Sequence, residues 1–115
     1  MKSKKIPWWT PQVEKTDITY VRKALDTNFV NEGPLTREFE RKIAAMVCAR
    51  YAIATTSCTT ALFLSLRAFG VRHGDEVIVP DMTFIATANA VDQAGGIPVF
   101  VDIDPKTLNM ATVAM

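Results

Sequence analysis

The first fifty residues carry two stretches in which apolar positions recur at helical spacing. In the first stretch, Ile18, Val21 and Leu25 stand at positions i, i+3 and i+7, so their side chains share one face of a helix. This pattern predicts a helix that starts at about Thr16, with Thr16 or Asp17 as its cap, and ends close to Asn28.

The second stretch follows a turn at residues 31–34. Its apolar stripe consists of Leu35, Phe39, Ile43 and Val47. Charged side chains occupy the positions between them, which is typical of a helix with one solvated face. The sequence therefore predicts a second helix, with Thr36 as its N-cap.

From residue 51 onward, short apolar runs alternate with helical stretches. The runs at 51–55, 76–80 and 98–104 have the length and composition of buried strands. Helices are predicted between them, at about 60–69 and from Thr83 to the glycine pair at 95 and 96. This alternation indicates an α/β fold with a parallel sheet that helices cover on both faces. Since sheets commonly have five or six strands, three strands indicate an incomplete one.

Composition and charge exclude several classes of function. The chain has 115 residues, of which 49% are hydrophobic and 22% charged, as in an ordinary globular domain. A formal net charge of +1 argues against a nucleic-acid-binding surface, which usually carries a clear basic excess. One histidine and two separated cysteines do not make a zinc site, so we expect no metal.

The sequence predicts a cytoplasmic protein that does not enter a membrane. No apolar segment follows the basic N-terminus, as a signal peptide would require. The uncharged stretch at 51–66 is interrupted by hydroxyl residues, so it does not read as a membrane span. Cys48 and Cys58 form no C-x-x-C pair and are typical of reduced thiols.

Hydroxyl groups gather where the first predicted strand leads into a helix, at Ser57, Thr59 and Thr60. Ligands of open α/β sheets bind beyond the carboxyl ends of the strands. A helix N-terminus at that place offers free N–H groups that suit a phosphate. The alternative is ordinary capping of the helix by Ser57 or Thr59, and this segment alone supports both interpretations.

Two further groups follow the other predicted strands. Phe84 comes after the strand at 76–80 and is either a stacking surface for a flat ligand or a core residue. Asp102 and Asp104 end the third strand and either cap turns or act on a substrate. His73 lies in a turn between a helix and a strand, where a solvated residue without a catalytic role is expected.

Five blocks of the sequence, taken in order, resemble the DegT/DnrJ/StrS family of sugar aminotransferases. The blocks lie at 31–40, 51–62, 74–80, 83–90 and 98–104. The resemblance extends from Ile6 to Asn109, and the order and spacing of the blocks make it specific.

The resemblance implies the fold of type I pyridoxal 5′-phosphate (PLP) dependent transferases, a three-layer α/β/α domain with a mostly parallel sheet. Residues 1–115 would form the N-terminal part of the large, PLP-binding domain. The rest of that domain, the small domain and the lysine that holds PLP as a Schiff base are expected outside this chain. No residue here is therefore assigned a catalytic role, and these 115 residues alone are expected to be inactive.

By resemblance, Cys58 and Thr59 contact the PLP phosphate, and Phe84 stacks on the pyridine ring. The family usually has glycine at the position of Cys58, and often glycine at the position of Cys48. Glycine allows a positive φ and a close approach of the backbone. A cysteine at position 58 still allows N–H contacts if its φ is negative.

The reaction implied by the resemblance is transfer of an amino group, from glutamate as the expected donor, to a nucleotide-linked keto sugar in sugar or polysaccharide biosynthesis. The family's active site is built by two subunits, so a homodimer is expected. Two alternatives remain open. One is a PLP-dependent sugar dehydratase of the same fold, which differs mainly at the lysine position. The other is a non-catalytic remnant or interaction module.

Overall fold

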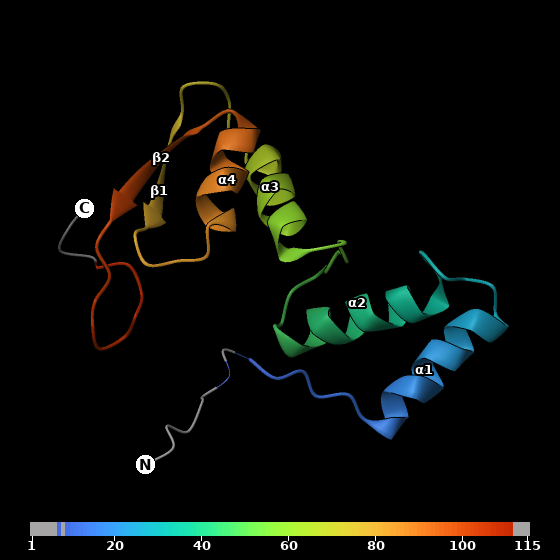
Figure 1. Cartoon of the computed structure of the whole chain (residues 1–115). Helices are drawn as coiled ribbons and strands as arrows, with labels where there is room; N and C mark the ends of the chain where they lie inside the picture. Colours follow the sequence, from blue (N-terminus) through green and yellow to red (C-terminus); the bar gives the residue numbers. More distant parts are fainter. Residues whose placement is uncertain (1–6, 8, 112–115) are drawn as a thin grey trace, which may run out of the picture. The chain divides into compact units, whose positions relative to one another are not determined.

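The computed structural model describes residues 7 and 9–111. Two compact units divide the chain, one that runs to Ala54 and one that starts at Thr55 (Figure 1). The first unit contains the helices α1 (Lys15–Asp26) and α2 (Pro34–Met46). The second unit contains, in order, α3 (Cys58–Ala68), β1 (Glu76–Pro80), α4 (Ala86–Ala94) and β2 (Ile97–Val101).

The four helices of the described residues end in the same way. A residue with left-handed backbone follows each helix, and these residues are Asn28, Cys48, Gly70 and Gly95, with φ of 57°, 53°, 85° and 91°. After α2, the N–H of Cys48 bonds to the carbonyl of Ala45 and the N–H of Ala49 to that of Ala44, at 3.3 and 2.9 Å. This pair of bonds is the Schellman motif, which satisfies carbonyls left free at a helix end. The predicted helix ends near Asn28, Gly70 and Gly95 are confirmed.

Two helix starts differ from the prediction. The helix α1 is capped at Glu14, whose N–H donates to the carboxylate of Asp17 over 2.8 Å. The predicted cap of α2 at Thr36 is wrong, because α2 begins at Pro34 with Gly33 as its N-cap. Proline suits the first helical position, since its fixed φ fits a helix and its missing N–H would have no partner there.

The predicted strand at 51–55 is not formed. The N–H of Ala54 donates to the carboxylate of Glu40 at 2.8 Å, both within the first unit. In the described residues β1 pairs only with β2, so the sheet has two strands where three were predicted. A strand forms only where a neighbouring strand makes hydrogen bonds to its backbone N–H and C=O groups. An apolar run in the sequence does not show whether such a neighbour is present.

The two strands that do form are parallel, as predicted, with a register from Glu76 opposite Ile97 to Pro80 opposite Val101. The N–H of Asp81 extends this pairing by a bond of 2.9 Å to the carbonyl of Val101. The strand β2 ends three residues before the predicted end at residue 104. Beyond it, Ile103 forms an isolated antiparallel bridge to Met110 instead of continuing along β1.

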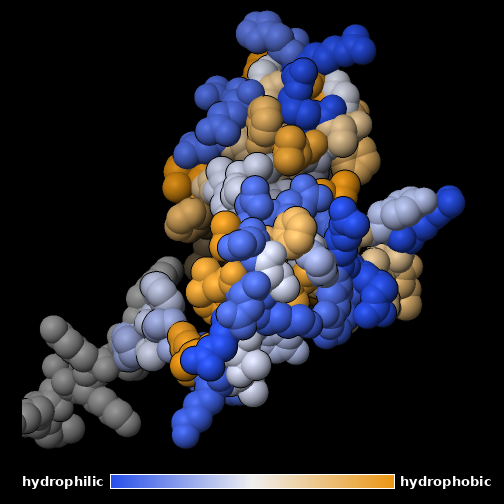
Figure 2. Space-filling view, turned by 90° about the vertical axis from the view of Figure 1, so that its right-hand side faces the viewer, coloured by the Kyte–Doolittle hydropathy of each residue, from blue (hydrophilic) through white to orange (hydrophobic). Residues whose placement is uncertain are grey.

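The helix α4 packs on both strands, and α3 packs on α4. Their contacts bury Val79, Ala86, Ala90, Val91 and Ala94. Three other apolar residues of the two strands, Ile78, Ile97 and Phe100, remain 45–57% exposed. The predicted cover of the sheet on both faces is therefore not seen within the described part of this unit, and Figure 2 shows apolar side chains among the polar ones on the surface. None of the helices in residues 9–111 combines the length and the apolarity needed to span a bilayer.

Candidate functional site

One end of the second unit gathers the features that the sequence singled out. The carboxyl ends of β1 and β2 and the N-termini of α3 and α4 point to the same end (Figure 1). Cys58 and Thr59 are the first two residues of α3, and Phe84 lies in the loop that joins β1 to α4. This is the end of an α/β sheet at which ligands bind.

The hydroxyl groups before and within the first turn of α3 serve as its cap. The backbone of Ser57 is extended, and its Oγ accepts the N–H of Thr60 at 3.1 Å. The Oγ1 of Thr60 also shares hydrogen bonds with Ser57 Oγ at 3.0 Å and with Thr56 Oγ1 at 3.3 Å. The capping interpretation is therefore correct for Ser57, whereas Thr59 has no part in the cap.

The N–H groups of Cys58 and Thr59 are left open by this cap. Within residues 9–111 neither of these N–H groups has a hydrogen-bond acceptor. The hydroxyl of Thr59 has no hydrogen-bond partner in these residues either. Both N–H groups lie at the positive end of the α3 dipole. Because Cys58 is already helical, its φ is negative, and a cysteine fits this position without strain. Two open N–H groups and a free hydroxyl suit the oxygens of a phosphate.

Phe84 is a surface residue in this structure. Its side chain is 76% exposed, so the core interpretation is not supported within the described residues. The helix α4 begins at Ala86 instead of the predicted Thr83, whose hydroxyl bonds to that of Thr87 at 2.9 Å. Phe84 thus belongs to the loop, and its carbonyl accepts the N–H of Thr87 at 2.9 Å.

The carboxylates after β2 have separate roles. The Oδ1 of Asp104 accepts the N–H groups of Lys106 and Thr107 at 2.7 and 3.1 Å, so Asp104 caps a turn. The carbonyl of Asp102 accepts the N–H of Ala111 at 2.9 Å, and its side chain is exposed. His73 is an exposed turn residue, as predicted.

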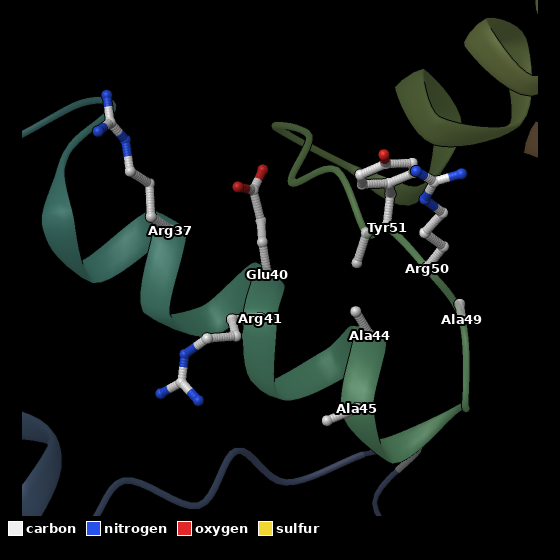
Figure 3. Close-up of a pocket in the computed structure, with 9 residues that line it drawn as sticks. Arg37, Glu40, Arg41, Ala44, Ala45, Ala49, Arg50 and Tyr51 are labelled. Atoms are coloured by element: carbon white, nitrogen blue, oxygen red, sulfur yellow. The ribbon is translucent and has the colours of Figure 1, made fainter.

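The first unit has a groove of about 470 Å³ between α2 and residues 49–52 (Figure 3). The side chains of Arg37 and Arg41 extend from α2 in different directions, and the guanidinium of Arg50 lies 5.2 Å from the ring centre of Tyr51. Since these cations do not converge on one point, the groove does not form an anion site. It was not apparent from the sequence, because the hydrophobic pattern does not show how the chain turns back along α2 after residue 48.

The helix α2 carries an ion pair between Lys42 and Glu38, with Nζ and Oε1 2.7 Å apart. The hydrogen bond and the positive charge of Lys42 hold the pKa of Glu38 below its usual value. The same bond and the charge of Glu38 raise the pKa of Lys42. Pairs of this kind on an open helix surface add little to stability, which agrees with the predicted solvated face.

Comparison with known proteins gives consistent matches along nearly the whole chain. The model of the DegT/DnrJ/EryC1/StrS aminotransferase family matches residues 11–115. The spore coat polysaccharide biosynthesis protein SpsC of Bacillus subtilis is 43% identical over 110 residues, which are 96% of this chain and 28% of SpsC.

Two solved structures show the same fold. Spr1654 from Streptococcus pneumoniae, in its PLP form, superposes with a TM-score of 0.83 at 37% identity, over 91% of this chain and 27% of Spr1654. A GDP-4-keto-6-deoxymannose-3-dehydratase with a trapped PLP–glutamate geminal diamine gives a TM-score of 0.82 at 26% identity, over 93% of this chain and 29% of the dehydratase. The chain thus spans less than a third of the length of each of these proteins.

Proposed function

Because the chain belongs to the DegT/DnrJ/EryC1/StrS aminotransferase family, we propose that the protein containing it transfers an amino group, from glutamate, to a nucleotide-linked keto sugar with PLP as cofactor. The family membership predicted from the five sequence blocks is confirmed by the family match over residues 11–115. We assign residues 1–115 to the N-terminal part of the PLP-binding large domain.

The observation that carries this proposal is the start of α3. The cap bond from Thr60 to Ser57 leaves the N–H groups of Cys58 and Thr59 without an acceptor in the described part of the chain. A helix start with open N–H groups stabilises a phosphate through hydrogen bonds and the helix dipole. PLP carries such a phosphate, so these residues fit the group. The exposed ring of Phe84, at the same end of the unit, suits the face of a flat pyridine.

PLP, when bound, supplies an electron sink for chemistry at the carbon that carries the amino group. The role of residues 1–115 is to hold and orient PLP. The N–H groups of Cys58 and Thr59 and the Thr59 hydroxyl would bind the phosphate, and Phe84 would cover one face of the ring. These side chains are not suited to move a proton at the reacting carbon, so we expect the acid and base of the reaction elsewhere in the protein.

The names of the related proteins support the substrate class. SpsC is named for polysaccharide biosynthesis, and the structurally similar dehydratase is named for a GDP-linked keto sugar and holds a PLP–glutamate adduct. The name of SpsC agrees with a role in polysaccharide biosynthesis, and that of the dehydratase agrees with a nucleotide-linked keto sugar as acceptor and glutamate as donor. We further propose a cytoplasmic homodimer, which the family resemblance and the two free thiols favour.

A second candidate is a sugar dehydratase of the same fold. The TM-score of the GDP-4-keto-6-deoxymannose-3-dehydratase, 0.82, lies between the 0.83 and 0.78 of the aminotransferase neighbours, so the fold of these residues does not separate the two reactions. The site at the start of α3 serves both, because both use PLP. The distinction depends on the residue at the cofactor-lysine position, which lies outside this chain.

The test uses the full-length gene product that contains these residues. It is reconstituted with PLP, its absorbance spectrum is recorded, and it is incubated with glutamate and a panel of nucleotide-linked keto sugars. We expect a bound-PLP band and a product in which an amino group replaces the keto oxygen, identified by mass spectrometry. A product that has lost water without gaining nitrogen would establish the dehydratase. Absence of any PLP band would overturn both.

A further inference from the structure

Three hydrogen bonds at the start of α3 meet at Thr60. Its N–H donates to the Oγ of Ser57 at 3.1 Å, and its own Oγ1 lies 3.0 Å from the same Ser57 Oγ. The Oγ1 of Thr60 also lies 3.3 Å from the Oγ1 of Thr56. All three residues belong to the second unit, so these contacts form within one compact part of the chain. Two groups of Thr60 thus hold the side-chain oxygen of Ser57.

The cap of a helix can close either of two N–H groups. The side-chain oxygen of an N-cap residue accepts from the second or from the third helical residue, and in α3 these are Thr59 and Thr60, because the helix begins at Cys58. In the described residues, the backbone N–H that Ser57 Oγ accepts is that of Thr60. A Ser57 oxygen that turned to Thr59 instead would close one of the two N–H groups that the proposed phosphate site uses.

We propose that Thr60 is a positioning residue that selects this cap and so keeps the N–H of Thr59 open for the phosphate of PLP, an inference that rests on the proposed function. Thr60 acts through Ser57 and not by contact with the phosphate. Its hydroxyl adds a second bond to Ser57 Oγ while that oxygen faces the third helical residue. The second bond favours the cap at Thr60 over the cap at Thr59.

The hydroxyl groups can satisfy this arrangement without a conflict of donors and acceptors. A hydroxyl donates one hydrogen and accepts up to two. When Ser57 Oγ accepts the N–H of Thr60 and donates its own hydrogen to Thr60 Oγ1, the hydroxyl of Thr60 is free to donate to Thr56 Oγ1. The Oγ1 of Thr55 donates to the carbonyl of Ser57 at 3.0 Å, which restricts the backbone of the cap residue as well.

The test compares three variants of the full-length gene product. Thr60→Val removes the hydroxyl and keeps the side-chain shape, and Thr60→Ser keeps a hydroxyl. Ser65→Ala is the control, because the Ser65 hydroxyl donates to the carbonyl of Ala61 within α3 at 2.8 Å and has no part in the cap. The dissociation constant of PLP is measured by fluorescence titration. We expect Thr60→Val to weaken PLP binding about threefold, the lower end of the effect of one hydrogen bond, whereas Thr60→Ser and Ser65→Ala should match the unsubstituted protein.

Hydrogen exchange resolved to single residues measures the change of cap in the apoprotein. In Thr60→Val the amide of Thr59 should exchange more slowly than in the unsubstituted protein, and the amide at position 60 should exchange faster. The same substitution in a Ser57→Ala background should leave the affinity for PLP at that of Ser57→Ala alone, because no side-chain oxygen remains at position 57 to close the N–H of Thr59.

Unchanged PLP affinity in Thr60→Val overturns the inference, and so does an equal loss of affinity with and without Ser57. If Thr60→Val does not fold, Thr60→Ala replaces it in the same comparisons, because alanine also lacks the hydroxyl and suits a helix better. Failure of the unsubstituted protein to bind PLP overturns the proposed function together with this inference. The other two results overturn the inference alone, so the two kinds of failure are distinct.

Discussion

The guanidinium of Arg67, through Nη1, donates to the main-chain carbonyl of Ala94 over 3.2 Å and so joins α3 to the C-terminal end of α4. The same nitrogen donates to the carbonyl of Val71 at 3.3 Å. Carbonyls at the end of a helix have no partner within it, and a cation there is also favoured by the helix dipole. Arg67 thus links the C-terminal end of α4 to α3, the helix that packs against it.

Replacing Arg67 with alanine should loosen the last turn of α4. The loss of a hydrogen bond from a charged donor, partly offset by water at this open position, should lower the local unfolding free energy by about 1 kcal/mol. Hydrogen exchange of the amides at the end of α4 in the full-length gene product measures this. Arg72→Ala is the control, since the Arg72 side chain makes no hydrogen bond in the described residues. Equal exchange in the two variants would show that the Arg67 bond contributes nothing.

Replacing cysteine with glycine should change the melting temperature in opposite directions at positions 48 and 58. Cys48 holds a left-handed backbone with φ of 53°, which costs a residue with a side chain about 1 kcal/mol relative to glycine. Cys48→Gly should therefore raise the melting temperature. Cys58 is the first helical residue of α3, and Cys58→Gly should lower it by a smaller amount, because glycine loses more conformational freedom than cysteine when it is fixed in a helix. Differential scanning calorimetry checks both, and shifts of the same sign would contradict the assigned backbone conformations.

The sequence predicted those features that depend on neighbouring residues. The helix ends at Asn28, Gly70 and Gly95 follow from local spacing and from residues that accept a left-handed backbone. Features that depend on distant partners were missed. The run at 51–55 reads as a strand, but its pairing requires a neighbour that no local pattern reveals.

In the candidate site, too, the sequence predicted the local features and missed a contact between residues that are far apart in the chain. The helix start that holds Cys58 and Thr59 and its cap at Ser57 follow from the local sequence. Their roles in binding PLP, and that of Phe84, come from the family resemblance and remain predictions. The bond from Glu40 to Ala54 had no signal in the sequence, because Glu40 stands in a charged run that predicts a solvated face.

Ser57→Ala and Thr59→Val should separate capping from phosphate binding. Ser57→Ala removes the acceptor for the N–H of Thr60 and should cost about 1 kcal/mol of stability. Thr59→Val keeps the side-chain shape and removes only a hydroxyl that has no partner in the described chain, so it should leave the melting temperature unchanged and weaken PLP binding. Calorimetry of the apoprotein and PLP titration measure the two effects. Loss of stability in Thr59→Val with unchanged PLP affinity would assign Thr59 to the fold.

Phe84→Ala should weaken PLP retention while the fold stays intact. An aromatic stacking contact contributes about 0.5–1.5 kcal/mol, so the dissociation constant should rise about two- to tenfold. Because the residue Phe84 is 76% exposed, removal of its side chain creates no cavity. Phe69→Ala is the control, since Phe69 is 89% exposed and lies at the opposite end of α3. A similar loss of PLP in both variants would mean that stacking by Phe84 is not the cause.

The two cysteines are both free and exposed, one in each unit of the chain. Their reactivity toward an alkylating reagent can therefore be used to detect a ligand at the candidate site. A phosphate or PLP at the start of α3 would shield the Cys58 thiol from an alkylating reagent, whereas Cys48 follows α2 and is not part of this helix start. The ratio of the two alkylated peptides in a mass spectrum therefore reports occupancy of the site from a single sample. No label has to be engineered, because one thiol serves as the reporter and the other as the internal standard.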